Sequence, residues 1–494
     1  MLRRPWIALL LALVAMCALF AVGQPDFVAS DPLWYAEIAH NMSAAPASVF
    51  ASHDLHPFVM RVGLTGPLAL IYALFGVSSS TTNLPSLLAA LAILGVIYAA
   101  MPTPRAKLVG LAVGVCSIPL LQNAMILNVD LPCAALMAVT VLWLGFRDRP
   151  RGAWWLAGAA AAWLAAFLVK EVAIWCAPVW IYAVVCDVRA VDRSSHDPAN
   201  PHRGRALLRR YLPAVVTGAV LGAAYLAFCA ALWGDAFARA HGITALTDEH
   251  AWSLRGHAAR EWLARMIWQP PILFAKLFLA TLLAALAAPW LVRGKDRLWL
   301  VAAATFAACY WFGSSSFSEY VPLPISPRMT TPLLPPVLVI AALAIDQLVD
   351  RKRWVAIVLG VAIALPALRI AFGLVTRPHP EAAAFAELRR EPGNLVLVCG
   401  EPRCIAIATW YYGFELPPTL TVVHANDFAA APLPAGAHVR ALVNRVRAPG
   451  AHRTDPKSDR TADIAALHLP VLAGNKNVTL YDAGDGTALQ RALH

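Results

Sequence analysis

Charged residues are scarce in this sequence, and their scarcity excludes an ordinary water-soluble protein. Only 14% of the 494 residues are Asp, Glu, Lys or Arg, whereas 59% are hydrophobic and the mean hydropathy is +0.61. A soluble core of this size could not bury so much apolar surface. The composition therefore predicts a polytopic membrane protein.

Zinc-binding patterns and solenoid repeats are also absent from the sequence. The nine cysteines are scattered, mostly inside apolar runs where they serve as small hydrophobic residues, and none combines with histidine at zinc spacing. Only Cys399 and Cys404 look able to pair, provided that their segment faces an oxidising compartment.

Positive charge is in excess but is not gathered into one patch. The net charge of +11 comes from short clusters of Lys and Arg that lie between apolar runs. Clusters of this kind set the orientation of membrane spans. We therefore expect membrane lipids, and no nucleic acid, as partners.

Apolar runs of about 17 to 20 residues, the length that crosses a bilayer, recur along the chain. The first run could also pass for a secretory signal peptide, but the many later runs make a retained helix the simpler interpretation. Eleven spans are predicted, at residues 6–23, 83–101, 106–122, 131–146, 153–169, 171–187, 211–233, 271–292, 298–312, 331–349 and 354–375.

One apolar run, at residues 61–77, is ambiguous because it is short and contains Gly63, Gly66 and Pro67. If it lies along the membrane surface, every short basic loop falls on one side, as the positive-inside rule requires. The N-terminus is then cytoplasmic. Asp31, Asp130, Lys170, Arg328 and the tail after residue 376 then share the outer face.

The regions outside the spans divide into a long first loop and a C-terminal tail. Loop 24–82 holds two candidate surface helices, near residues 32–43 and 61–75. After residue 376 charged and turn residues increase, and short β-rich runs appear at 395–399, 420–423, 439–443 and 478–481. A helical segment at 382–390 alternates with them. The fold class is thus mainly α, a membrane helix bundle over residues 1–375 followed by a small α/β domain over 376–494.

Two carboxylates stand at the mouths of predicted spans. Asp31 follows the first span, and Asp130 precedes the span that begins at Leu131. Carboxylates are costly to desolvate, so in such places they commonly line a wet cavity where something binds or reacts. The alternative is that each simply caps a helix, since Asp31 precedes Pro32 and Asp130 lies close to Pro132.

The run from Asp31 to Ala39, D-P-L-W-Y-A-E-I-A, resembles the first-loop signature of the GT-C superfamily of lipid-linked glycosyltransferases. The similarity is closest to the protein O-mannosyltransferase and aminoarabinose transferase branch, whose loop reads D-E-x-x-Y-A-E-I. Further matches follow in order over residues 1–375: His56-Pro57, the segment 83–86, Asn128-Val-Asp130, Lys170 and Pro327-Arg328. The second acidic residue of the family pattern is replaced here by Pro32, which puts in doubt any metal site built there in relatives.

The resemblance implies transfer of a sugar from a polyprenyl phosphate to an acceptor hydroxyl at the outer membrane surface. Asp31 would accept the hydroxyl proton, and Asp130 would orient the acceptor or steady the developing positive charge. Lys170 and Arg328 would bind the departing lipid phosphate, and a single displacement would invert the sugar carbon. Tyr35, Glu37, His56 and Arg61 are further site candidates, and the acceptor could be a glycan, a lipid or a protein.

We expect no cofactor. His53, Asp54 and His56 could form a divalent metal site, but no further ligand follows at a regular spacing. The abundance of Ala and Arg suggests a GC-rich bacterium, and so an inner membrane with the active face and the C-terminal domain in the periplasm.

Other interpretations stay open. Lys170 could form only an interfacial ion pair with Glu171, and Arg328 could anchor the headgroup region. The whole chain could be a transporter or lipid flippase, although inverted repeats with matched broken helices are not apparent. It could also bind a lipid-linked sugar without consuming it.

Overall fold

The computed structural model describes most of the chain. The described residues are 4–23, 31–46, 49, 57–194, 202–249, 259–314, 320–376, 380–400, 402–430, 436–444, 460–474 and 478–493. Contacts divide the chain into two compact units. The first comprises Met1–Gly23, Pro46–Pro67 and Asn83–Gly373, and the second comprises Gln24–Ala45, Leu68–Thr82 and Leu374–His494.

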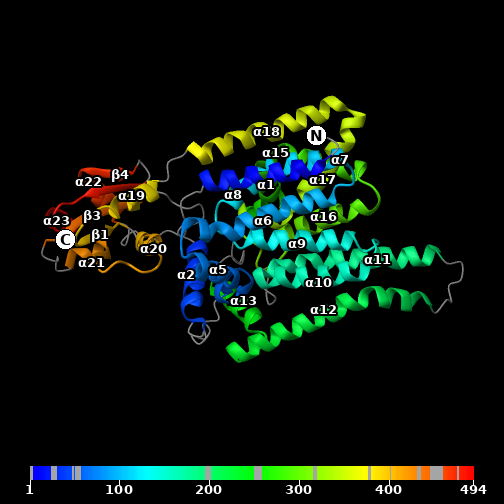
Figure 1. Cartoon of the computed structure of the whole chain (residues 1–494), viewed down its shortest axis with the longest axis horizontal. Coiled ribbons are helices and arrows are strands. Elements are labelled where there is room, and N and C mark those ends of the chain that lie inside the picture. Colours follow the sequence, from blue (N-terminus) through cyan, green and yellow to red (C-terminus); the bar gives the residue numbers. More distant parts are fainter. Residues whose placement is uncertain are drawn as a thin grey trace. The chain divides into compact units, whose positions relative to one another are not determined.

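The first unit is a bundle of long helices, many of which run side by side (Figure 1). Two helices, α5 (Val62–Phe75) and α6 (Ser79–Ala100), cross the boundary between the units. The other elements of the bundle are α1 (Pro5–Val22), α4 (Pro57–Met60), α7 (Pro104–Val115), α8 (Ile118–Ala124), α9 (Asp130–Gly145), α10 (Gly152–Val169), η1 (Glu171–Cys176), α11 (Ala177–Ser194), α12 (His202–Trp233), α13 (Ala238–Glu249), α14 (Ala259–Leu263), η2 (Ala264–Trp268), α15 (Gln269–Leu291), η3 (Gly294–Asp296), α16 (Arg297–Phe312), η4 (Arg328–Leu333), α17 (Leu334–Arg351) and α18 (Arg353–Thr376).

The described helices confirm a multi-pass membrane bundle. Among them, eight are long and apolar enough to cross a membrane, or nine if α7 and α8, which bend by 60° at a short break, form one span. These nine match nine of the eleven predicted spans. The other two are α9 and α16, each of 16 residues and so about 24 Å long, which is short for a bilayer core of about 30 Å.

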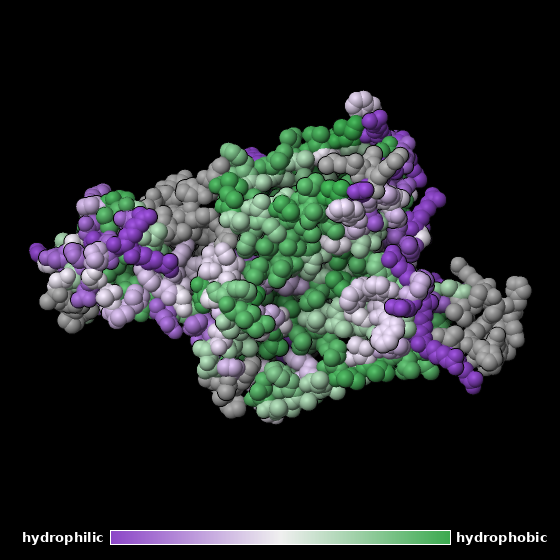
Figure 2. Space-filling model, viewed as in Figure 1, coloured by the Kyte–Doolittle hydropathy of each residue, from purple (hydrophilic) through white to green (hydrophobic). Residues whose placement is uncertain are grey.

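One end of the bundle gathers the loops that were predicted to be cytoplasmic. Arg147, just after α9, donates to Asp187 near the end of α11, and Arg210 near the start of α12 pairs with the same carboxylate. Arg105, near the start of α7, donates to Asp346 near the end of α17. We call this the basic end. In Figure 2 hydrophobic residues cover the sides of the bundle and hydrophilic residues gather at its right-hand end.

The second unit is built on a mixed five-stranded sheet with the strand order β2-β1-β3-β5-β4. Strand β1 pairs in parallel with β2 and β3, whereas β5 runs antiparallel to β3 and β4. The elements of this unit are α2 (Asp31–Ala44), α19 (Pro380–Leu388), β1 (Leu395–Cys399), α20 (Pro402–Tyr411), β2 (Leu420–His424), α21 (Ala425–Ala430), β3 (His438–Asn444), α22 (Thr461–Ala466), β4 (Val471–Gly474), β5 (Val478–Asp482) and α23 (Thr487–Leu493).

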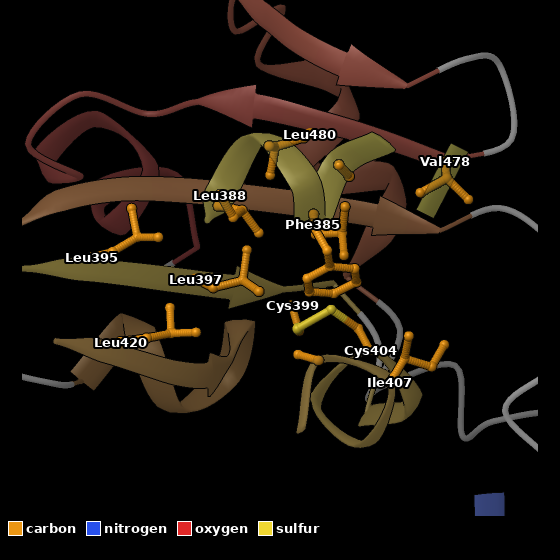
Figure 3. Close-up of a cluster of buried hydrophobic side chains, with 13 residues drawn as sticks. Phe385, Leu388, Leu395, Leu397, Cys399, Cys404, Ile407, Leu420, Val478 and Leu480 are labelled. Carbon is orange, nitrogen blue, oxygen red and sulfur yellow. A yellow bond between two sulfur atoms is a disulfide. The ribbon is translucent and has the colours of Figure 1, made fainter. Parts of the chain in front are cut away.

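Both faces of this sheet are buried, because alternate residues of β1 enter two different cores. Leu395, Leu397 and Cys399 pack with Phe385 of α19 and Ile407 of α20 (Figure 3). Val396 and Val398 enter the opposite core, together with residues from α21, α22 and α23. This alternation is what a strand covered by helices on both sides requires.

The α/β character predicted for the tail is confirmed, as is the pairing of its two cysteines. Cys399, at the end of β1, forms a disulfide with Cys404 in the first turns of α20 (Figure 3). All four predicted strands are present, but β4 was missed. It has only four residues, lies at the sheet edge, and ends in Ala473 and Gly474, so it lacks the β-branched alternation that marks a strand.

Candidate active site

Asp130 is the first residue of α9, yet its carboxylate does not cap that helix. The capping is done by Asn128, whose side-chain oxygen accepts the Leu131 N–H at 2.7 Å. The carboxylate of Asp130 is thereby left for other contacts, and the residue is only 1% exposed. The interpretation of Asp130 as a plain helix cap is therefore wrong.

Two residues of α6 hold the loop that leads into Asp130. The side-chain oxygen of Asn83 accepts the Leu127 N–H at 2.6 Å, and the hydroxyl of Ser86 accepts the Asn128 N–H at 3.3 Å. Both side chains are buried, so these hydrogen bonds satisfy amides that would otherwise be desolvated without a partner. The segment 83–86, which was singled out only by its resemblance to the GT-C pattern, thus holds the loop that precedes Asp130.

Lys170 lies at the break between α10 and η1 and is paired with Asp130. Its backbone is extended, with φ −153° and ψ 142°, so its side chain and that of Glu171 point in opposite directions. The ammonium donates to Asp130 Oδ1 at 2.5 Å and contacts Met329 Sδ at 3.3 Å. The ion pair predicted between Lys170 and Glu171 is replaced by this buried pair, in which both side chains are at most 3% exposed.

Glu171 is held instead by two arginines. Arg61 donates to Glu171 Oε1 at 2.7 Å, and Arg239 donates to Glu171 Oε2 at 3.3 Å. The guanidinium of Arg239 also lies over the ring of Phe167 at 4.6 Å and is almost completely buried. Arg239 was not singled out from the sequence, because its partners lie about 70 residues away on other helices.

Gly63 brings Arg61 to this position. A Cβ at Gly63 would lie 2.7 Å from Leu168 C and from Val169 N, so the start of α5 packs directly on the backbone at the end of α10. That end immediately precedes Lys170 and Glu171. Any larger residue at position 63 would push α5, and Arg61 with it, away from Glu171.

Arg328 is the fourth cation near these two carboxylates, and it approaches Asp130. Its Nε lies 3.8 Å from Asp130 Oδ2, and with 41% of its side chain exposed it is the most accessible of the four cations. Arg265 steadies the segment before it, since it donates to the carbonyls of Tyr310 and Leu323. The hydroxyl of Thr330 then donates to Pro327 O at 2.6 Å, which fixes the turn that carries Arg328.

We call these six residues the charge cluster: Arg61, Asp130, Lys170, Glu171, Arg239 and Arg328. Among the described residues, these four cations and two carboxylates carry a formal charge of +2. Excess charge that is largely removed from water is costly unless an opposite charge joins it. The cluster is therefore suited to bind an anion.

The remaining predicted site residues belong to the second unit or fall outside the described residues. Asp31, Tyr35 and Glu37 are on α2, which belongs to the second unit. Asp31 is half-buried as the first residue of the helix, Tyr35 is completely buried and Glu37 is exposed. His56, like His53 and Asp54, falls outside the described residues. Within the described residues, no group of three or more His, Cys, Asp or Glu side chains is placed to hold a metal ion.

The arrangement of helices is that of a known membrane protein. No protein-family model matches the sequence, and no curated protein matches it. Two crystal structures of ArnT from Cupriavidus metallidurans do match its fold. The apo structure has a TM-score of 0.52 at 15% identity and covers 98% of both chains. The structure bound to undecaprenyl phosphate has a TM-score of 0.51 at 15% identity, covering 98% of this chain and 99% of ArnT.

The chain has the ArnT fold. This likeness confirms the expected fold class, a membrane helix bundle followed by a C-terminal sheet domain, and both parts are included in the match. At 15% identity the likeness establishes the fold, so the chemistry of the present chain must be argued from its own residues.

Proposed function

We propose that this chain is an integral-membrane glycosyltransferase that moves a sugar from a polyprenyl-phosphate donor to an acceptor hydroxyl. The observation that carries the proposal is the charge cluster, which gathers four cations around two carboxylates in the bundle, with three of the four cations buried. A lipid-linked phosphate is an anion that reaches such a site from within the membrane. The ArnT fold adds support, because one of the matching ArnT structures is bound to undecaprenyl phosphate.

Three of the four cations would stabilise the phosphate as it leaves the sugar. Negative charge grows on the lipid phosphate while its bond to the anomeric carbon breaks, and fixed cations aimed at it lower the barrier. Arg328 is the most accessible of them, and Nη1 of Arg239 is buried with no hydrogen-bond acceptor among the described residues. We assign these two arginines to the phosphate, together with Lys170.

Asp130 acts through its neighbours in this proposal. Its carboxylate holds the ammonium of Lys170 at 2.5 Å and lies 3.8 Å from Arg328. Because Asp130 is almost completely buried, we assign it to the orientation of these cations rather than to direct contact with the acceptor. Glu171 has the same positioning role for Arg61 and Arg239.

Asp31 is proposed as the base. The acceptor oxygen attacks the anomeric carbon, the carbon–oxygen bond to the lipid phosphate breaks, and the hydroxyl proton passes to the Asp31 carboxylate. A single displacement of this kind inverts the sugar carbon. The products are the glycosylated acceptor and free polyprenyl phosphate.

We further propose that the reaction faces the periplasm of a bacterial inner membrane. The Cys399–Cys404 disulfide supports an oxidising compartment for the C-terminal domain. The arginines gathered at the basic end of the bundle fit the cytoplasmic side.

The test is transfer by the purified protein in lipid nanodiscs, with radiolabelled polyprenyl-phosphate sugars and lipid or glycan acceptors. Asp31→Asn should insert and fold normally but lower turnover about a hundredfold to ten-thousandfold, the usual range for a lost general base. Asn41→Ala, an exposed site on the same helix, is the matched control and should keep full activity. Undiminished turnover in Asp31→Asn would refute the assigned base. Movement of an uncleaved donor across sealed vesicles would refute the transferase.

A further inference from the structure

The second unit contains a set of contacts that link the C-terminal domain to α2, the helix that carries Asp31. One side of this link is formed by residues Leu68–Thr82, here called the corner, which comprise the second half of α5, the turn after it and the start of α6. Gly76, with φ +73°, ends α5, since only glycine adopts this conformation without strain. Ser78 and Thr81 then cap α6 reciprocally, each amide donating to the hydroxyl of the other residue. The corner is therefore a defined structure rather than a loose loop.

Trp410 of α20 is hydrogen-bonded to the corner. Its indole N–H donates to Thr82 Oγ1 at 3.2 Å, and this hydroxyl shares a second hydrogen bond of 2.7 Å with the Tyr72 hydroxyl. All three side chains are buried. Buried polar groups in a connected network specify one arrangement, because any displacement would leave a desolvated group without its partner.

Phe414, just after α20, makes the corresponding contact with α2. Its ring stacks on the imidazole of His40, with the two ring centres 5.0 Å apart. Phe414 has φ +67°, a conformation that bulky residues rarely adopt and that costs energy to maintain. The preceding residue, Gly413, packs close to Val77 of the corner. The chain thus keeps a strained backbone in the place where it contacts both α2 and the corner.

The other face of α20 is fixed to the sheet. Cys404 is joined by its disulfide to Cys399 at the end of β1, and Ile407 and Ala408 are buried in the core beneath it (Figure 3). Helix α20 is therefore attached on one side to the β-sheet domain and on the other to α2 and the corner.

We infer that α20 is a positioning element for the Asp31 helix, in which Phe414 contacts α2 and Trp410 fixes α20 to the corner. The C-terminal domain is then a working part of the transferase. Its sheet provides a rigid base, and α20 transmits that rigidity to α2. The claim that α20 affects catalysis rests on the proposed function, because it assumes that Asp31 is the base. The claim that α20 positions α2 does not depend on that function.

Hydrogen–deuterium exchange of the full chain in nanodiscs tests the positional claim without any turnover. Trp410→Phe keeps an aromatic ring and removes the N–H donor, and Phe414→Ala removes the stack on His40. In each variant, amide exchange in α2 should rise on the order of tenfold, as expected for a lost buried contact, while α9 and α17 keep their protection. Trp354→Ala, an indole that is 80% exposed, is the matched control and should change neither region.

Two results would overturn the positional claim: unchanged exchange in α2, or faster exchange throughout the bundle, which indicates only a general loss of stability. Turnover is then measured on the same samples. A fall in kcat with an unchanged KM for the lipid donor supports the claim that α20 affects catalysis, and full turnover despite a loosened α2 contradicts it. If wild-type protein transfers no sugar at all, the proposed function fails, while the exchange result still decides whether α20 positions α2.

Discussion

The basic end of the bundle and the charge cluster each contain a buried ion pair, but they differ in the balance of positive and negative charge. At the basic end Arg147 and Arg210 share Asp187, which also accepts the Tyr211 hydroxyl, and Arg210 pairs in addition with Asp148. There, positive charge is matched by carboxylates. In the charge cluster, counting only the residues that the structure describes, four cations face two carboxylates.

This difference separates structural from functional charge. Ion pairs in which the positive and negative charges balance need no ligand, so their loss should affect stability alone. A cluster that gathers more cations than carboxylates attracts an anionic ligand, so its loss should affect both stability and activity. The comparison can be tested with equivalent substitutions in the two places.

Removal of a central cation should give the largest effect. Lys170→Met leaves the buried Asp130 carboxylate with only Arg328, at 3.8 Å, as a cationic neighbour and should cost about 3 to 5 kcal/mol of stability. Arg147→Met removes the closer cation from Asp187, which keeps Arg210 and the Tyr211 hydroxyl, and should cost less stability. Turnover per folded molecule should separate the two: we expect a loss of about a hundredfold or more in Lys170→Met and none in Arg147→Met. Thermal unfolding and kcat are measured together, and equal losses of kcat would remove the distinction between the networks.

A smaller effect is expected from Arg239→Gln. Glu171 keeps its pair with Arg61, so the fold should tolerate the change, but one cation for the phosphate is lost. Hydrogen bonds to charged groups contribute about 1.5 to 3 kcal/mol, which corresponds to a decrease in kcat/KM for the lipid donor of about tenfold to a hundredfold. Arg105→Gln, at the basic end, is the control. An unchanged kcat/KM in Arg239→Gln would exclude Arg239 from phosphate binding.

The smallest effect concerns the packing that positions Arg61. Gly63→Ala introduces a methyl group against the backbone of α10 and should cost about 1 to 3 kcal/mol. Gly66→Ala, in the same helix, meets no atom within 4 Å and should be neutral or slightly stabilising. Unfolding temperatures of the two variants provide the comparison, and equal values would show that the close approach at Gly63 has no energetic importance.

Much of the architecture could be predicted because it depends on local composition. Apolar runs located the helices, and the β-rich runs located four strands. The edge strand β4 was not predicted because its short sequence has no periodic signal. The bend between α7 and α8 was not predicted because the run 106–122 is apolar on both sides of the break.

The candidate site could be predicted only in part, because its pairs form between distant helices. Charge near the ends of spans identified Asp130, Lys170 and Arg328, which the structure brings together. Nothing local indicated that Glu171 joins Arg61 to Arg239, or that Asn128 replaces Asp130 as the helix cap. A basic residue close to the end of a span, such as Arg239, is the one signal that could have been followed.

The most direct test of the account is the binding of two lipids that differ only in charge. Native mass spectrometry of the protein in detergent would compare polyprenyl phosphate with the uncharged polyprenol, in wild type, Arg239→Gln, Arg328→Gln and the control Arg105→Gln. The account predicts that wild type and Arg105→Gln prefer the phosphate by a wide margin, and that the other two variants lose most of this preference. Equal binding of the two lipids by wild type, or an undiminished preference in both cluster variants, would contradict it.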